Sequence, residues 1–238
     1  MKSINKLNIF FLFSTLIFFN PHISYADQNS NEDTMDNLYA IGGLMDKVID
    51  KVPGMGGGDA PDMGGQKTEL VKLFSESSEY YMTAQAYLLQ SLKKDEEAQK
   101  VLAGIEFSKN SKNSDADRMA NSIKVSDDAS KVIESSMKGG SIELTAESKV
   151  LYAQSLPPAG KGVISTIKLG PVAQGMVATI QANPMSALDQ LGGLVKVIPK
   201  LPGYISTLTN TMKLVLTAAK ANNVDGTKDF EAVLSDLD

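Results

Sequence analysis

The sequence predicts an all-α fold, an irregular multi-helix bundle with short helices in its C-terminal half. Three observations support this class. Apolar residues recur at steps of three and four along most of the chain, helix-capping and helix-ending residues repeat, and aromatic residues make up only 6 %. Only two short runs, SIEL at 141–144 and GVISTIKL at 162–169, are plausible strands. We therefore expect helices that each bury one stripe against their neighbours.

The N-terminus is typical of a secretory signal peptide. Two lysines precede an apolar run at residues 9–19, which is too short to span a bilayer comfortably. Ser24 and Ala26 then occupy the two small positions of a cleavage site. We expect residues 1–26 to be removed and the protein to be secreted or periplasmic. An uncleaved N-terminal anchor is the alternative.

The rest of the chain lacks the residues on which most catalytic sites depend. Cysteine is absent, and the single histidine, His22, lies in the predicted signal peptide. This excludes zinc bound by His or Cys, Ser-His-Asp triads and thiol nucleophiles. We expect a non-catalytic protein with no cofactor and no metal. A hydrolase that uses paired carboxylates is the remaining enzyme class, but such acids on helices are typical surface residues. The candidate acids are Glu76, Glu79, Glu96 and Glu97.

Charge is distributed unevenly along a chain whose net charge is −5. Residues 27–157 hold 14 basic and 22 acidic side chains, whereas 158–220 hold six lysines and only Asp189. A net acidic chain is a poor candidate for binding nucleic acid, whose phosphates require Lys and Arg. The basic apolar block 158–220 could form the core, or it could lie on an anionic lipid surface. The lysines that could contact lipid are Lys161, Lys168, Lys196, Lys200 and Lys213.

The predicted organisation has three parts after the signal peptide. Residues 27–52 form an amphipathic helix, with apolar side chains at helical spacing and acids and lysines on the opposite face. Residues 53–67 form a linker rich in Gly, Pro and Met. Residues 68–238 form a helical domain.

Within this domain, the stripe that begins at Leu70 predicts a long helix, and three acids at residues 95–97 fit the first turn of the next one. Ser126 is expected to cap a helix that runs to about Met137. A short helix should follow and end at Pro157. The apolar stripe of the first helix consists of Leu70, Phe74, Ser77, Tyr81, Ala84, Leu88 and Ser91.

The region after residue 160 is expected to form two or three short buried helices. Gly170 and Pro171 should end one helix, and Asn183 with Pro184 should open the next. The twenty uncharged residues between Lys168 and Asp189 would also be long enough to cross a membrane. We favour the buried helices, since these breaks and three amides interrupt the run. Two more helices are expected, one over 205–219 and a short terminal one around Phe230.

One phrase of the sequence occurs twice. Residues 35–54 read MDNLYAIGGLMDKVIDKVPG, and residues 185–203 read MSALDQLGGLVKVIPKLPG. With one gap, eleven of nineteen aligned pairs are identical, which fits either a duplication or a chance echo. Paired glycines weaken a helix, so we expect a neighbouring helix to approach the backbone there. The gap and Pro199 make a repeated ligand site less favoured than packing. The predicted contact glycines are Gly42, Gly43, Gly192 and Gly193.

Two functions fit these observations best. The first is a secreted or periplasmic helical interaction protein that binds an unknown protein partner without catalysis. The second is a lipid-binding or membrane-surface protein that uses the basic apolar block 158–220.

Overall fold

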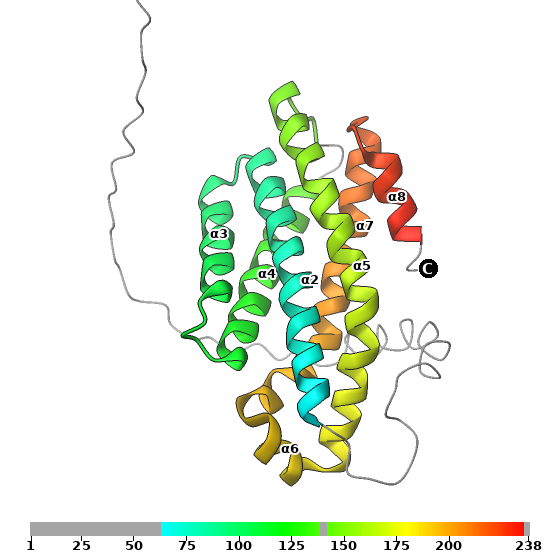
Figure 1. Cartoon of the computed structure of the whole chain (residues 1–238). Helices are drawn as coiled ribbons and strands as arrows, with labels where there is room; N and C mark the ends of the chain where they lie inside the picture. The colour runs from blue at the N-terminus through cyan, green and yellow to red at the C-terminus, as the bar shows by residue number, and fades with distance from the viewer. Residues whose placement is uncertain (1–62, 139–141, 236–238) are drawn as a thin grey trace, which may run out of the picture. The chain divides into compact units, whose positions relative to one another are not determined.

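The computed structural model describes residues 63–138 and 142–235, and these residues form an all-α fold without strands, as the sequence predicts (Figure 1). Both candidate strands fail to form, because residues 162–169 lie in a helix and 142–144 have no regular structure. The helices are α2 (Met63–Ser91), α3 (Asp95–Lys109), α4 (Asp115–Met137), α5 (Ala146–Ala182), α6 (Pro184–Leu191), α7 (Leu201–Ala221) and α8 (Thr227–Ser235), with 3-10 turns η2 (Gly192–Lys196) and η3 (Ile198–Lys200) between α6 and α7.

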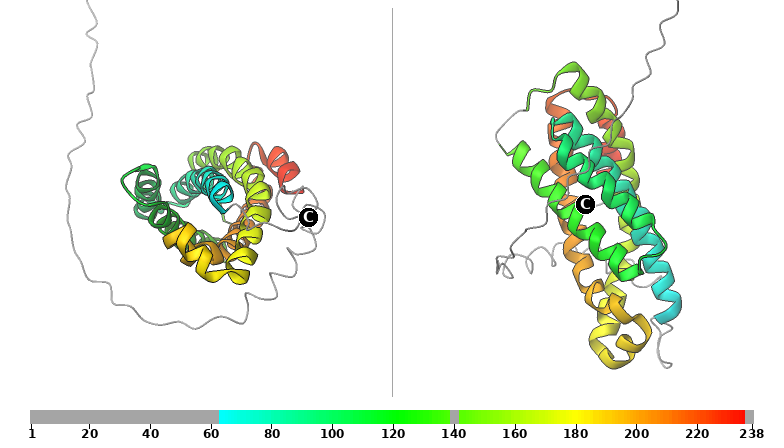
Figure 2. Two further views of the ribbon diagram at one scale, coloured as in Figure 1. Left: turned by 60° about the horizontal axis from the view of Figure 1, so that its bottom comes forward. Right: turned by 90° about the vertical axis from the view of Figure 1, so that its left-hand side faces the viewer.

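Helix α2 is the central element of the bundle. It packs against α3 and α4 on one side and against α5 on the other, and the end-on view of Figure 2 shows it between them. All seven residues of its predicted stripe, from Leu70 to Ser91, are buried, so this prediction is confirmed. Met82, Ala86 and Leu89 are buried as well, on other sides of the helix. The absence of charge from residue 80 to residue 92 permits this burial on several sides.

Helix α5 is one continuous helix of 37 residues, and the predicted ends at Pro157 and Pro171 are wrong. Proline in a helix interior removes a hydrogen bond and costs roughly 3 kcal/mol. The long interface between α5 and α2, the largest between any two helices here, offsets that cost through burial. Gly170 also eases the strain, because it has no Cβ to collide with the ring of Pro171.

Two helices begin earlier than the sequence predicts. Helix α4 starts at Asp115, capped by Ser114, whose hydroxyl accepts a hydrogen bond from the Asp117 amide at 3.1 Å. Ser126 is therefore a buried residue in mid-helix rather than a cap. Helix α2 starts at Met63, inside the segment predicted as linker, because the Met63 side chain is buried in the core.

The second copy of the repeated phrase forms α6, η2 and η3 and enters α7. Asn183 and Pro184 open α6 as predicted. The helix does not continue through the glycine pair, because Gly192 adopts φ +56° and ends α6. Glycine adopts positive φ with less strain than any other residue, so Gly192 can end the helix here. Pro199 lies in η3, where a short 3-10 turn accommodates it.

Candidate interaction surface

The outer side of α5 carries a row of exposed residues at helical spacing. We call the following residues the α5 outer face: Val150, Gln154, Pro157, Lys161, Ile164, Ile167 and Lys168. Steps of three and four lead from Val150 to Ile164, and Ile167 and Lys168 lie three and four residues after Ile164, so all seven share one side of the helix. Val150, Ile164 and Ile167 are 58 %, 45 % and 40 % exposed. The expectation that the helices of this region are simply buried is therefore wrong for one side of α5.

The electrostatics of this face differ from those of the rest of the molecule. Between Glu147 and Asp225 the only acidic residue is Asp189, which lies on α6. Residues 63–138, in contrast, hold 12 acidic and 11 basic side chains. The α5 outer face is thus largely apolar and carries two lysines and no carboxylate of its own, which favours an apolar or anionic partner.

Buried contacts fix the direction in which the α5 outer face points. On the opposite side of α5, a Cβ added at Gly162 would lie 3.0 Å from Cγ of Tyr81, so the helix backbone packs directly on that ring. The Thr166 hydroxyl lies 2.9 Å from the Ser77 hydroxyl of α2. Tyr152 donates a hydrogen bond to the Val215 carbonyl of α7 at 2.8 Å. Rotation of α5 would break these buried interactions, which is costly.

The predicted lipid-contact lysines come from four different elements. Lys161 and Lys168 lie two turns apart on the α5 outer face, and the Lys161 ammonium sits 5.6 Å from the centre of the Tyr80 ring, within cation–π range. Lys196 lies in η2, Lys200 in η3 and Lys213 in α7, and all three are exposed. The structure therefore places only two of the five on one helix face.

Of the four predicted contact glycines, only Gly192 and Gly193 lie among the described residues, and they differ from each other. Gly42 and Gly43 lie outside the described residues. Gly192 is exposed, and a Cβ added there would meet nothing within 4 Å, so no helix covers it and the prediction is wrong at this position. Gly193 is exposed too, but α4 does approach it: an added Cβ would lie 3.0 Å from Cβ of Ala116. The physical reason is that the pair begins the short 3-10 turn η2 after α6 rather than continuing an α-helix.

Buried polar groups join α2 to α4. The side-chain amide of Gln85 donates to the Ser126 carbonyl at 2.9 Å and to the Ser130 hydroxyl at 3.0 Å, and the Ser126 hydroxyl donates back to Gln85 at 2.9 Å. Nearby on α4, burial raises the pKa of Asp127 to about 6, although Lys131 opposes the shift. One Asp127 carboxylate oxygen is buried and has no hydrogen-bond partner among the described residues.

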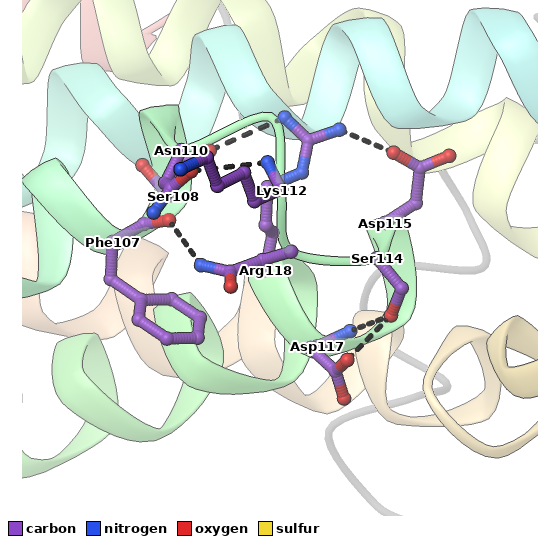
Figure 3. A network of polar contacts seen from close by, with 9 residues as sticks. Phe107, Ser108, Asn110, Lys112, Ser114, Asp115, Asp117 and Arg118 are labelled. Atoms are coloured by element: carbon purple, nitrogen blue, oxygen red, sulfur yellow. Dashed lines mark hydrogen bonds and ion pairs between the residues drawn. The ribbon is translucent and has the colours of Figure 1, made fainter.

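A second polar cluster closes the connection between α3 and α4. Figure 3 shows Arg118 bridging the two helices: it donates to the Ser108 carbonyl at 3.3 Å and pairs with Asp115. The Asn110 side chain accepts from the Lys112 amide at 3.0 Å in the same loop. These bonds satisfy helix ends and loop amides, so the cluster holds the loop in shape.

Two of the four carboxylates considered for hydrolysis take part in surface ion pairs. Glu79 pairs with Lys109 at 2.9 Å, and Glu96 pairs with Lys100 at 3.0 Å. All four side chains are substantially exposed, so their charges are well solvated. Among the described residues, no group of three or more His, Cys, Asp or Glu side chains could hold a metal ion.

Sequence reasoning missed the exposed apolar residues Val150, Ile164 and Ile167. The available signal is the absence of acidic residues from 148 to the end of α5, which on its own predicts burial in the core. Helix α5 is also long and apolar enough to cross a membrane, a property that the core helices of soluble proteins share. In its most apolar stretch of 18 residues, 44 % is buried in the bundle.

Comparison of this chain with protein-family models, with curated proteins and with solved structures finds no significant match.

Proposed function

We propose that this chain is a non-catalytic helical binding protein, secreted or periplasmic, that recognises a protein partner through the α5 outer face. The observation that carries the proposal is the exposure of Val150, Ile164 and Ile167 on a helix side that carries no acid after Glu147 in its first turn. Exposed apolar residues that cluster on one face are typical of interaction sites, whereas scattered ones need no explanation. The part of the proposal that concerns export rests on the signal-peptide pattern of the N-terminus.

The rigidity of the face supports a protein partner. The bonds from Tyr152 and Thr166 hold α5 in place from two sides. A partner would therefore meet a surface that needs no rearrangement, which reduces the entropic cost of association. From Val150 to Lys168 the face extends for about 27 Å along the helix axis, enough to lie along a helix of similar length in a partner.

Site-specific cross-linking in the native host tests this proposal. A photoreactive amino acid replaces Ile164, and the matched control replaces Leu102 on α3, which is 38 % exposed. We expect one defined protein adduct at residue 164 that is absent at residue 102. The double variant Ile164→Asp/Ile167→Asp should abolish binding of that partner, while Leu102→Asp should not. Identical adducts at both positions, or no adduct at residue 164, would contradict the proposal.

An anionic membrane surface is the second candidate, favoured by Lys161 and Lys168 on a face without acids. A cationic face with apolar side chains can lie in the headgroup region of such a membrane. Flotation with phosphatidylglycerol vesicles at low salt tests it. If it is correct, the chain floats with these vesicles but not with phosphatidylcholine vesicles, and Lys161→Ala/Lys168→Ala removes flotation. The matched control is Lys100→Ala/Lys124→Ala on α3 and α4. Full recovery of the wild-type chain in the soluble fraction would exclude this candidate.

A further inference from the structure

A second exposed apolar surface lies on α6, the gold helix at the lower end of the bundle in Figure 1. Met185 is 75 % exposed and Leu188 is 52 % exposed. The two residues are three positions apart, so they share one side of the helix. The opposite side of α6 buries Ala187 and Leu191 in the core. This pair is distinct from the α5 outer face, and the inference below does not depend on the proposed function.

The repeated phrase links this surface to another part of the chain. The identities between its two copies include Met35 with Met185 and Leu38 with Leu188. In the second copy, the shared residues Leu194 and Ile198 are buried, so packing in the core explains why these positions are apolar. Packing of α6 into the bundle does not explain Met185 and Leu188. Met185 and Leu188 therefore remain available for a contact outside the packed core of the bundle.

We propose that residues 35–52 of this same chain bind to α6 and cover Met185 and Leu188. Residues 35–52 lie outside the described residues, so their sequence and their point of attachment carry the argument. Their apolar positions recur at helical spacing, which suits an amphipathic helix that lies against an apolar surface. Met35 and Leu38 provide the apolar pair that would meet the pair on α6.

The attachment point favours this occupant. Only residues 53–62 separate the segment from Met63, the first residue of α2, and α2 packs against α6. Ten residues reach about 33 Å when extended, and a Gly-rich chain of that length has a mean span of about 17 Å. The segment is therefore held close to α6, at an effective concentration on the order of millimolar.

The two parts carry small net charges of opposite sign. Residues 35–52 hold three aspartates against Lys47 and Lys51, a net charge of −1. Residues 185–203 hold Lys196 and Lys200, both exposed, against the single Asp189. Opposite charges near an apolar contact orient the approach and disfavour other registers.

The lack of cysteine makes a clean cross-linking test possible. In the full chain, Leu38→Cys is combined either with Leu188→Cys or with the control Leu102→Cys on α3, and a short bis-maleimide is added. We expect an intramolecular cross-link with the first pair and none with the second. A cross-linked dimer would show that a second copy of the chain occupies α6 and would overturn the proposal. Equal cross-linking of both pairs, or none, would overturn it too.

A labelling experiment gives an independent readout in the same chain. Met185→Cys is exposed to a bulky maleimide in the full chain, with and without the additional change Leu38→Asp. If the segment covers α6, Leu38→Asp should raise the labelling rate at residue 185 at least about fivefold, because labelling follows the fraction of open molecules. The same change should leave the labelling of Leu102→Cys unaltered. An unchanged rate at residue 185 would overturn the proposal.

Discussion

Helices α2 and α5 lie side by side along their length, yet the sequence uses them differently. Helix α2 is buried on several sides, and its interior polar groups, such as Gln85, find partners on α4. Helix α5 buries one side against α2, and from Val150 onward it leaves the other side exposed, largely apolar and free of acids. Apolar residues on all sides of a helix therefore do not show that the whole helix is buried in the core. Burial on one side and binding on the other can produce the same composition.

Truncation of leucine and isoleucine side chains is the strongest test of this comparison. Leu88→Ala in α2 and Leu169→Ala in α5, both fully buried, should each lower the free energy of unfolding by about 3 kcal/mol, because each leaves a cavity. Ile164→Ala on the α5 outer face should lower it by less than about 0.5 kcal/mol. Urea denaturation followed by circular dichroism measures all three. A loss at Ile164 as large as that at Leu169 would mean that this face is part of the core.

The polar contact between α2 and α4 should give the next largest effect. Gln85→Ala leaves the Ser130 and Ser126 hydroxyls without their partner in the core, so we expect a loss of about 2 kcal/mol in the free energy of unfolding. Ser126→Ala in the Gln85→Ala background should cost less than Ser126→Ala alone, and the difference gives the coupling energy. Strictly additive effects in urea denaturation would mean that the two side chains act independently.

The buried carboxyl group of Asp127 on α4 should make the stability of the fold depend on pH. Its pKa is raised to about 6 by burial, so the folded state binds the proton more tightly than the unfolded state does. The penalty for the charged form is therefore absent below the ordinary pKa near 4 and grows as pH rises through about 6. Asp127→Asn should stabilise the fold by about 1 kcal/mol at pH 7.5, allowing for solvent screening of a half-buried group, and by almost nothing at pH 4. Urea titrations at the two pH values measure this. Equal effects at both would contradict it.

Two glycines of the second half should respond in opposite directions to the same change. An added Cβ meets nothing within 4 Å at either Gly192 or Gly203, so the two sites differ only in their backbone conformation. Gly192 has φ +56° and ψ −128°, a conformation that is strained for any residue with a Cβ, so Gly192→Ala should destabilise the fold by more than about 1 kcal/mol. Gly203 lies in α7, and Gly203→Ala should stabilise it by about 0.5 kcal/mol. Thermal unfolding resolves the two signs. Destabilisation by both would show that the turn conformation is not the cause.

The sequence predicts the elements of the first half better than those of the second. The α2 stripe follows from periodicity alone, because a helix buried along that stripe needs every third or fourth residue to be apolar or small. The start of α4 was missed, since both Ser114 and Ser126 precede aspartates and local sequence cannot distinguish two equally good caps. Only the packing of Ser126 against Gln85 decides between them.

In the second half, packing between helices overrules strong local signals in the sequence. Pro157 and Pro171 are strong local signals for a helix end, but the interface of α5 with α2 outweighs them. Of the residues that form the α5 outer face, the sequence singled out Lys161 and Lys168 but not Ile164, because composition cannot say which side of a helix is covered. The glycine pair was assigned to a helix on the basis of helical spacing, and the positive φ of Gly192 depends on a turn that only the structure defines.

The bonds from Tyr152 and Thr166 that hold α5 in place have a consequence for the kinetics and heat of binding. A surface that exists before the encounter should bind in one step, with variants of the face changing the dissociation rate much more than the association rate. Burial of Ile164 and Ile167 in the complex should also give a negative change in heat capacity, whichever sign the enthalpy takes.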